Sequence, residues 1–360
     1  RLKEKYKDNI IYSQQQGTTF YISTNIDRVA YNHTAKTSDA EKTSTKKALL
    51  NKDFRQSLAF ATDRKAGLSQ VFGDEVAPRK LRTSLTPPTF VQVGEQSFGQ
   101  VAKAELDKLD GVWKDVSLDD AQDSLHNVDK AKAKLEAAKK TLQADGVQFP
   151  IHLDIPVSST RPQFVRQAQS YKQSVEEALG ADNVVVDIQQ VSDDELASMT
   201  ILATSNTNTD WDINANSGWG PDYADPSTYL DIFYPHSGPN LLGSLGVTPG
   251  KDSSAIKAVG LDKFKELLTD ASAEKTNLAN RYAKYAKAQA WLTDSALVIP
   301  VQSNGAQMLV TKKVLGTGAY GWVGDKTSEN SYKYLKLQDK IVTTKEMDEF
   351  RKKFADEKAN

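Results

Sequence analysis

Residues 211–226 read Trp211-Asp212-Ile213-Asn214-Ala215-Asn216-Ser217-Gly218-Trp219-Gly220-Pro221-Asp222-Tyr223-Ala224-Asp225-Pro226. Residues 211–215 alternate apolar with polar side chains, as a half-buried β-strand does, and the Gly and Pro residues that follow predict a break. We therefore expect a strand that leads into a rigid loop with Asp222 at its tip. Rigid loops at strand ends often carry binding groups, because the scaffold fixes the loop while the loop exposes its side chains.

The segments before this stretch alternate between strand and helix patterns. We expect strands at 151–155 and 184–188, and helices at 164–179 and 192–203, the latter opened by a capping box of Ser192 and Glu195. Strand, helix, strand, helix, strand is the order of an α/β domain with a largely parallel sheet. In such sheets ligands bind beyond the carboxyl ends of the strands, which is where Asp222 would lie.

The rest of the chain gives further local predictions. Strands are expected at 18–23, at 308–314 and at 296–301, the last at a sheet edge or strand start because it contains Pro300. Helices are expected at 51–64 with Asn51 as the cap, at 127–145, 227–233, 261–269, 276–292 and 346–358. Residues 32–48 look like a surface loop, residues 73–98 like an irregular connection, and residues 316–331 like a crossing point between domains.

Composition excludes several classes of function. A length of 360 residues favours two domains or one domain with a large appendage. The net charge is −1 and no long basic block occurs, which argues against nucleic acid as the main partner. The absence of cysteine excludes disulfides and thiolate chemistry. No apolar run approaches the ~20 residues of a membrane span. The chain begins at Arg1 without a signal peptide or initiator Met, as a processed or truncated product would.

Motifs of catalytic and cofactor sites are weak or missing. Residues 316–321 have the spacing G-x-G-x-x-G, but no helix pattern follows, so a flexible turn is favoured over a dinucleotide site. Asp193, Asp194 and Glu195 are best interpreted as charges at a helix start. No metal or cofactor is expected, because the four histidines are scattered and His152 suits a structural place on a strand. They are His33, His126, His152 and His236.

Two carboxylates of the opening stretch could bind a ligand or cap the helix expected at 227–233. For Asp225, which precedes Pro226, capping is favoured, whereas for Asp222 the residues alone leave both roles open. Trp219, Pro221 and Tyr223 would give Asp222 a stiff, apolar and partly buried setting. Such a carboxylate suits a cationic group, above all an ammonium, because pairing offsets the desolvation of both charges.

Three stretches resemble one family. Residues 217–226 resemble the loop of the oligopeptide-binding proteins of ABC importers, in which an aspartate three residues after a tryptophan holds the α-ammonium of the peptide. Residues 54–64 resemble the family's helix of the form (V/F)RQAL(A/S)xAxDR, and residues 281–316 are similar to its late helix and strand. The pattern, including residues 334–340, is most similar to the streptococcal peptide-binding lipoproteins of the Ami/Ali kind.

The resemblance implies an α/β, periplasmic-binding-protein-like fold of type II. Residues 16–324 would form the second, peptide-binding lobe, and residues 1–15 and 325–360 would be part of the first lobe, with hinges near 14–18 and 316–331. The N-terminal portion of the family pattern, with its lipobox cysteine, is missing from this chain. The implied function is to capture oligopeptides and deliver them to the permease subunits of an ABC transporter. This would be a monomeric, non-enzymatic protein, lipid-anchored at the extracellular face of the cell membrane.

The resemblance also assigns the ligand site. It implies that Asp222 anchors the peptide ammonium and Trp219 walls the site, while Gly218 and Gly220 let the loop backbone approach the ligand. Asn216, where some relatives carry an Arg that reaches the peptide C-terminus, and Tyr223 complete the expected ligand-binding set. Two alternatives are a hydrolase that pairs Asp222 with a second carboxylate, and a surface receptor or adhesion module that binds a protein partner through lysine-rich helices such as 127–145.

Overall fold

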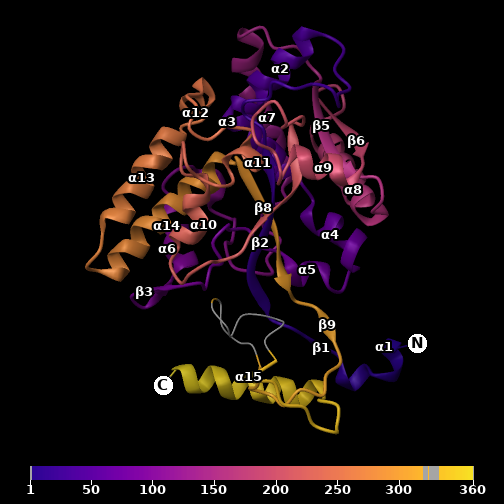
Figure 1. Ribbon diagram of the computed structural model, residues 1–360, viewed down its shortest axis with the longest axis vertical. Helices are drawn as coiled ribbons and strands as arrows, with labels where there is room; N and C mark the ends of the chain where they lie inside the picture. The colour runs from indigo at the N-terminus through magenta and orange to yellow at the C-terminus, as the bar shows by residue number, and fades with distance from the viewer. Residues whose placement is uncertain (1, 319–322, 324–331, 360) are drawn as a thin grey trace.

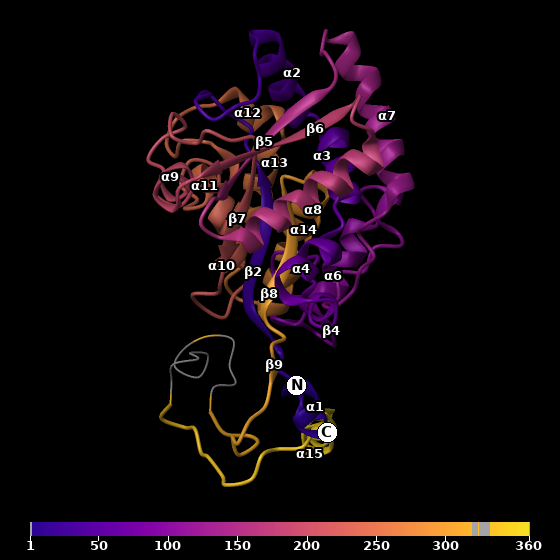
Figure 2. The ribbon, with the colours of Figure 1, turned by 90° about the vertical axis from the view of Figure 1, so that its right-hand side faces the viewer.

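The structure is a computed structural model that describes residues 2–318, 323 and 332–359, apart from the side chains of residues 216, 358 and 359. Most elements lie in a main body, and a smaller part lies at one end of the molecule (Figures 1 and 2). The smaller part contains α1 (Leu2–Lys5), η1 (Lys7–Asn9), β1 (Ile11–Tyr12), β9 (Met308–Leu309) and α15 (Thr344–Ala359). It joins the main body where β1 and β9 pair antiparallel. The G-x-G-x-x-G motif and the crossing expected at 316–331 fall largely outside the described residues.

A three-stranded antiparallel sheet runs through the main body in the order β7-β2-β8. It consists of β7 (Ile213–Trp219), β2 (Gln15–Thr24) and β8 (Val298–Gly305). The Thr, Phe, Tyr and Ile residues of β2 are typical of strands, because their side chains pack well on a pleated surface. Pro300 pairs with Tyr21 from β8, an edge strand, which confirms the position expected for a strand that contains proline.

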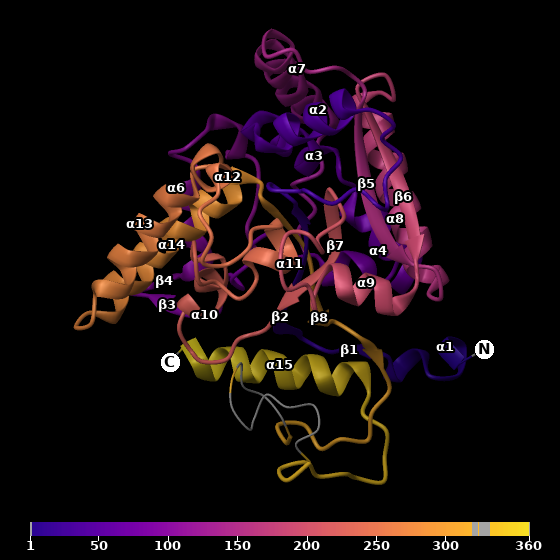
Figure 3. The same ribbon diagram turned by 45° about the horizontal axis from the view of Figure 1, so that its top comes forward.

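A second sheet confirms part of the predicted parallel arrangement. β5 (Ile151–Ser158) and β6 (Val184–Val191) are parallel and are connected by α8 (Pro162–Leu179). The predicted third parallel strand is wrong, because β7 pairs antiparallel with β2. Figure 3 shows β7 beside β2 and β8, with β5 and β6 to one side. The predicted break at Gly218 is also wrong, since pairing with β2 keeps the chain extended as far as Trp219.

Most predicted helices are present. Asn51 caps α3 (Lys52–Ala61) by accepting a hydrogen bond from the amide of Phe54 at 3.0 Å. Ser192 and Glu195 form the expected capping box of α9 (Asp193–Met199), and the charges at its start lie where a helix dipole favours them. The loop expected at 32–48 is wrong over its second half, where α2 (Asp39–Leu50) begins with a capping box of Ser38 and Glu41. That helix has a weak apolar stripe, so periodicity did not reveal it.

The other helices enclose the core. They are α4 (Arg64–Phe72), α5 (Ala77–Lys80), α6 (Phe98–Leu106), α7 (Val128–Ala144), α10 (Ser227–Leu230), α11 (Leu241–Leu245), α12 (Ser254–Ala258), α13 (Leu261–Ala273) and α14 (Leu278–Ser295). Short elements complete the described chain, namely the hairpin β3 (Gln92–Val93) and β4 (Gln96–Ser97), and η2 (Gly111–Trp113) and η3 (Asp231–Phe233). Pairs α3 and α7, α6 and α14, α13 and α14, and α4 and α8 pack against each other. Among the described helices, none combines the length and apolar character needed to cross a membrane.

Candidate functional site

β7 has one free edge. β2 occupies one side of the strand, and no strand among the described residues pairs along the other side. β5 reaches this side just before the strand starts, where the Asp212 amide donates to the Asp154 carbonyl at 3.0 Å. Farther along, Ala215 is exposed and Ser217 and Trp219 are half-buried. A free edge presents alternate N–H and C=O groups to any extended chain laid beside it.

Asp222 lies three residues beyond the end of β7 and is exposed. Its carboxylate has no hydrogen bond or ion pair with any described residue, whereas its amide donates to Thr228 Oγ1 at 2.9 Å. The expected partial burial is therefore wrong for this chain, because the neighbouring Tyr223 is itself 49% exposed and does not cover the loop. The result is a solvent-facing anion on a loop whose backbone is fixed.

Trp219 and the two glycines pack the loop onto β2. Trp219 is half-buried against the main core, and its indole N–H has no acceptor in the described part of the chain. A Cβ added to Gly218 would lie 2.7 Å from Cδ1 of Phe20, and one added to Gly220 would lie 2.9 Å from Oγ1 of Thr18. Both glycines therefore have a packing role toward β2 that the sequence did not indicate. The side chain of Asn216 lies outside the described residues, so its ligand role stays a prediction.

The carboxylate of Asp225 is bound by other residues of the same chain. Its Oδ1 accepts hydrogen bonds from the amide and the hydroxyl of Ser227, at 3.0 and 2.6 Å, at the first residue of α10. Its two oxygens also bind Arg281, at 2.8 and 3.1 Å. Burial alone would raise the pKa of Asp225, but the hydrogen bonds from Arg281 and Ser227 outweigh burial and hold this pKa below its usual value. Asp225 thus binds the first amide of α10, although the cap position of that helix is occupied by Pro226 and not by Asp225.

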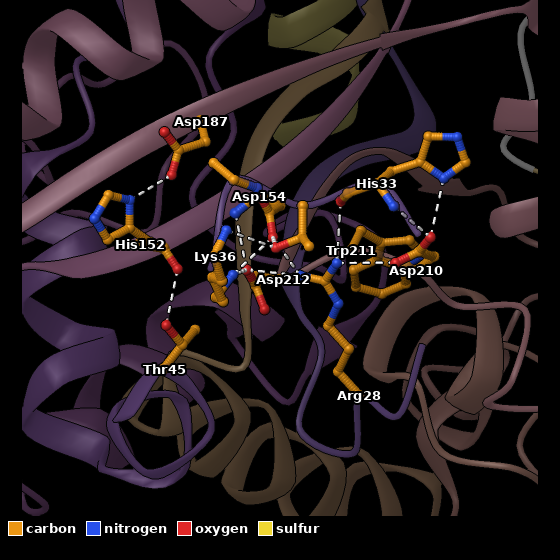
Figure 4. Close-up of polar contacts among 12 residues, drawn as sticks. Arg28, His33, Lys36, Thr45, His152, Asp154, Asp187, Asp210, Trp211 and Asp212 are labelled. Atoms are coloured by element: carbon orange, nitrogen blue, oxygen red, sulfur yellow. Dashed lines mark hydrogen bonds and ion pairs between the residues drawn. The ribbon is translucent and has the colours of Figure 1, made fainter. Parts of the chain in front are cut away.

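A buried ionic network holds the start of the same stretch (Figure 4). Arg28 lies 2.6 Å from Asp154, 2.9 Å from Asp210 and 2.9 Å from Asp212. Lys36 lies 2.7 Å from Asp154 and 2.5 Å from Asp212. These five side chains are at most 4% exposed. Because every member is paired and enclosed, the network is a structural anchor for β5 and β7 rather than a place for a ligand.

Sequence reasoning missed this network. Asp154 occupies a polar position of an alternating strand pattern, where a side chain is expected to face solvent, so no sequence signal indicated that this acid is buried. Asp210 and Asp212 flank Trp211, which is the one local hint of buried acids. Their cationic partners lie on the segment after β2, and no local pattern connects the two segments. Burial alone would raise the pKa of Asp154, but Lys36 and Arg28 outweigh it and keep this pKa well below its ordinary value.

The histidines and lysines singled out in the sequence have local roles. His152 Nδ1 lies 2.8 Å from Asp187, and its carbonyl accepts a hydrogen bond from Thr45, which confirms its structural role. Within the described residues no three acidic or histidine side chains are grouped as a metal site would need. On α7, Lys134 pairs with Asp53 and Asp110 of its own chain, at 3.1 and 2.7 Å. Part of the lysine-rich face is thus bound internally.

Residues 1–240 match the middle region of family 5 of the bacterial extracellular solute-binding proteins. The chain belongs to this family. Family 5 proteins are solute-binding proteins, which argues against the alternative that this chain is a hydrolase. The description of the family also places its members outside the cell.

Two curated relatives match all or nearly all of this chain. Oligopeptide-binding protein SarA of Streptococcus gordonii is 52% identical over 360 residues, which are 100% of this chain and 54% of that protein. Oligopeptide-binding protein AliA of Streptococcus pneumoniae is 51% identical over 359 residues, again 54% of that protein. The predicted resemblance to Ami/Ali-type proteins is confirmed. The chain spans about half the length of the curated relatives it matches.

A solved structure supports the fold. The substrate-binding domain of an oligopeptide ABC transporter from Bacillus anthracis superposes with a TM-score of 0.60 at 20% identity. The match covers 94% of this chain and 53% of that one. It confirms the predicted α/β solute-binding fold.

Proposed function

We propose that this chain is part of an extracellular protein that captures oligopeptides and delivers them to an ABC transporter. The observation that carries the proposal is the exposed carboxylate of Asp222, which has no partner among the described residues and is fixed just beyond the edge of β7 that no described strand covers. The names of the two streptococcal relatives, both oligopeptide-binding proteins, support the same ligand class. An α-ammonium is the cationic group that every unblocked peptide carries, so it is the natural partner for Asp222.

The proposed role of Asp222 also implies a direction for the peptide. With its ammonium at Asp222, beyond the C-terminal end of β7, the peptide must run back toward the start of that strand. It would therefore lie antiparallel to β7 and add its backbone to the free edge. Backbone pairing gives affinity that does not depend on sequence, while Trp219 and Tyr223 would contact side chains near the peptide N-terminus. Water in wide pockets would accommodate the remaining side chains.

The rest of the assembly belongs to the same proposal. Residues 16–324 would be one lobe, and residues 1–15 and 325–360 would contribute to the other, with the hinge where β1 and β9 meet the main body. The complete protein would be a monomer, held at the outer face of the membrane by an N-terminal lipid, and would present the peptide to the permease subunits. In support, the smaller part of the structure lies at one end and connects through this strand pair (Figure 2).

Substitution of Asp222 tests the ligand contact. Removing one partner of an ion pair that the bound peptide buries costs roughly 3–5 kcal/mol, so Asp222→Asn should weaken peptide binding by about two to three orders of magnitude. The measurement is calorimetry on the full-length protein with the peptides that co-purify with it. Asp182→Asn, at an exposed turn before β6, is the matched control. An affinity of Asp222→Asn within about threefold of wild type, little more than half a kcal/mol, would contradict the proposal.

A further inference from the structure

Asp225 connects the ligand loop to a helix far away in the sequence. Its carboxylate binds Arg281 of α14 through two hydrogen bonds, from Nε at 2.8 Å and from Nη2 at 3.1 Å. The two side chains are only 18% and 15% exposed. A planar guanidinium that grips both carboxylate oxygens fixes orientation as well as distance. Asp225 therefore cannot turn without breaking this pair.

Arg281 is itself held in place. Its Nη1 donates to three carbonyls at the end of α13 and just beyond it, at 3.3, 3.2 and 3.3 Å, namely those of Ala271, Ser272 and Glu274. The guanidinium also lies over the ring of Tyr285, 5.0 Å from its centroid. One arginine thus ties the loop to the junction of two long helices. We call the ion pair of Arg281 with Asp225 the clamp. The clamp is rigid because Arg281 is held by backbone carbonyls.

Asp222 depends on this clamp for its position. Its side chain has no partner in the described part of the chain. Its amide donates a hydrogen bond to the hydroxyl of Thr228, in the first turn of α10. The Thr228 amide in turn donates to the Asp225 carbonyl at 3.0 Å. The exposed carboxylate is consequently placed by residues 225–228, which Arg281 anchors.

We propose that Arg281 is a positioning residue for ligand binding: through Asp225 it fixes the loop that aims the Asp222 carboxylate at the peptide ammonium. The inference rests on the proposed function of Asp222. Its consequence is specific, because a displaced Asp222 loses its contact with the ammonium while the backbone pairing along β7 is kept. The clamp should therefore control the preference for a free peptide N-terminus rather than affinity in general.

The test compares two probes on the full-length protein. One is an alanine hexapeptide with a glutamine at its third position and a free N-terminus, and the other is the same peptide with an N-acetyl group. The wild type should prefer the free amine, and Asp222→Asn should abolish this preference. Arg281→Ala should reduce the preference by about tenfold, and Arg281→Lys should restore part of it. Binding of the acetylated probe should change less than about threefold.

Two controls separate positioning from stability. Lys284→Ala removes a different ion pair of the same helix, 2.9 Å from Lys284 to Asp270, and should leave the preference unchanged. In the Asp222→Asn background, Arg281→Ala should have no further effect, since there is no carboxylate left to aim. If Arg281→Ala does not fold, Asp225→Asn replaces it, because asparagine keeps the size of the side chain but weakens the pair with Arg281. It should likewise reduce the preference for the free-amine probe.

The outcomes distinguish the two proposals. A wild type without preference for the free amine would overturn the role of Asp222 itself. A wild type that shows the preference, with Asp222→Asn lacking it but Arg281→Ala and Asp225→Asn retaining it, would overturn the clamp alone. A loss of affinity that is equal for both probes would identify a purely structural ion pair and would also overturn the clamp.

Discussion

At the scale of single residues, Asp231 is an unsatisfied acid behind the ligand loop. One oxygen of its carboxylate is buried and has no hydrogen-bond partner among the described residues. Burial raises the pKa of Asp231 to about 6, with a further contribution from Asp225 and an opposing one from Arg281. The folded protein therefore binds a proton at Asp231 at pH values where the unfolded chain has already released it.

This shift predicts a dependence of stability on pH. Because the folded-state pKa is above the unfolded one, the contribution of Asp231 to the free energy of unfolding should fall as pH rises from about 4 to about 6. Asp231→Asn should remove this fall and stabilise the protein at pH 7 by about 1–2 kcal/mol, after allowance for solvent screening. Urea unfolding of the wild type and of Asp231→Asn between pH 4 and pH 8 measures this dependence of the free energy of unfolding on pH. Parallel pH profiles for the variant and the wild type would refute the assignment.

At the scale of elements, the contact between β2 and the loop decides where Asp222 lies. Gly17 of β2 faces Pro221, and a Cβ at Gly17 would lie 2.8 Å from Cδ of that ring. The hydroxyl of Tyr229 donates to the Gly17 carbonyl at 2.5 Å and closes the same contact from α10. The proline ring is rigid, so the loop itself would have to move.

Gly17→Ala should therefore disturb both stability and binding. Overpacking at a tight contact costs typically 1–3 kcal/mol, and the shifted Pro221 would carry the adjacent Asp222 with it. Gly67→Ala is the matched control, because its added Cβ would meet only Gln167 at 3.7 Å and it lies within a helix, where alanine is favoured. Thermal unfolding and peptide calorimetry should show a loss for Gly17→Ala and none for Gly67→Ala. Equal behaviour of the two variants would show that the loop absorbs the extra carbon.

At the scale of the whole molecule, the buried network holds three distant segments together. Arg28 and Asp154 are 126 residues apart in the chain, and Lys36 and Asp212 are 176 apart. The network joins the segment after β2 to β5 and to the start of β7. Its pairs therefore connect the β5–β6 sheet to the three-stranded sheet (Figure 4).

Loss of one cation should be costly. Lys36→Met leaves Asp154 and Asp212 buried with less compensation, so it should lower the free energy of unfolding by about 3–5 kcal/mol. Lys42→Met, which removes a surface pair with Asp39, should change it by less than about 1 kcal/mol. Because the pKa of Asp154 is depressed, its stabilisation should be present above about pH 4 and be lost as pH falls further. Chemical denaturation of both variants checks these values, and a small effect of Lys36→Met would show that water replaces the amine.

The sequence by itself determined the local features. Caps at Asn51, Asn127 and Ser192, and the amphipathic pattern of α8, depend on residues within a few positions of each other, so the order of side chains decides them. The strand-end loop with a lone acid at Asp222 was recognisable in the same way, as was the family.

The tertiary structure alone decided which strands pair and which charges meet. β7 reads locally as the next strand of a parallel sheet, yet it binds the distant β2 antiparallel, because side-chain alternation specifies a strand but not its neighbour. The exposure of Asp222, the packing role of Gly218 and Gly220, and the grip of Arg281 on Asp225 follow from that pairing and from helices packed behind it. They arise from contacts between residues far apart in the chain, for which a local pattern carries no signal.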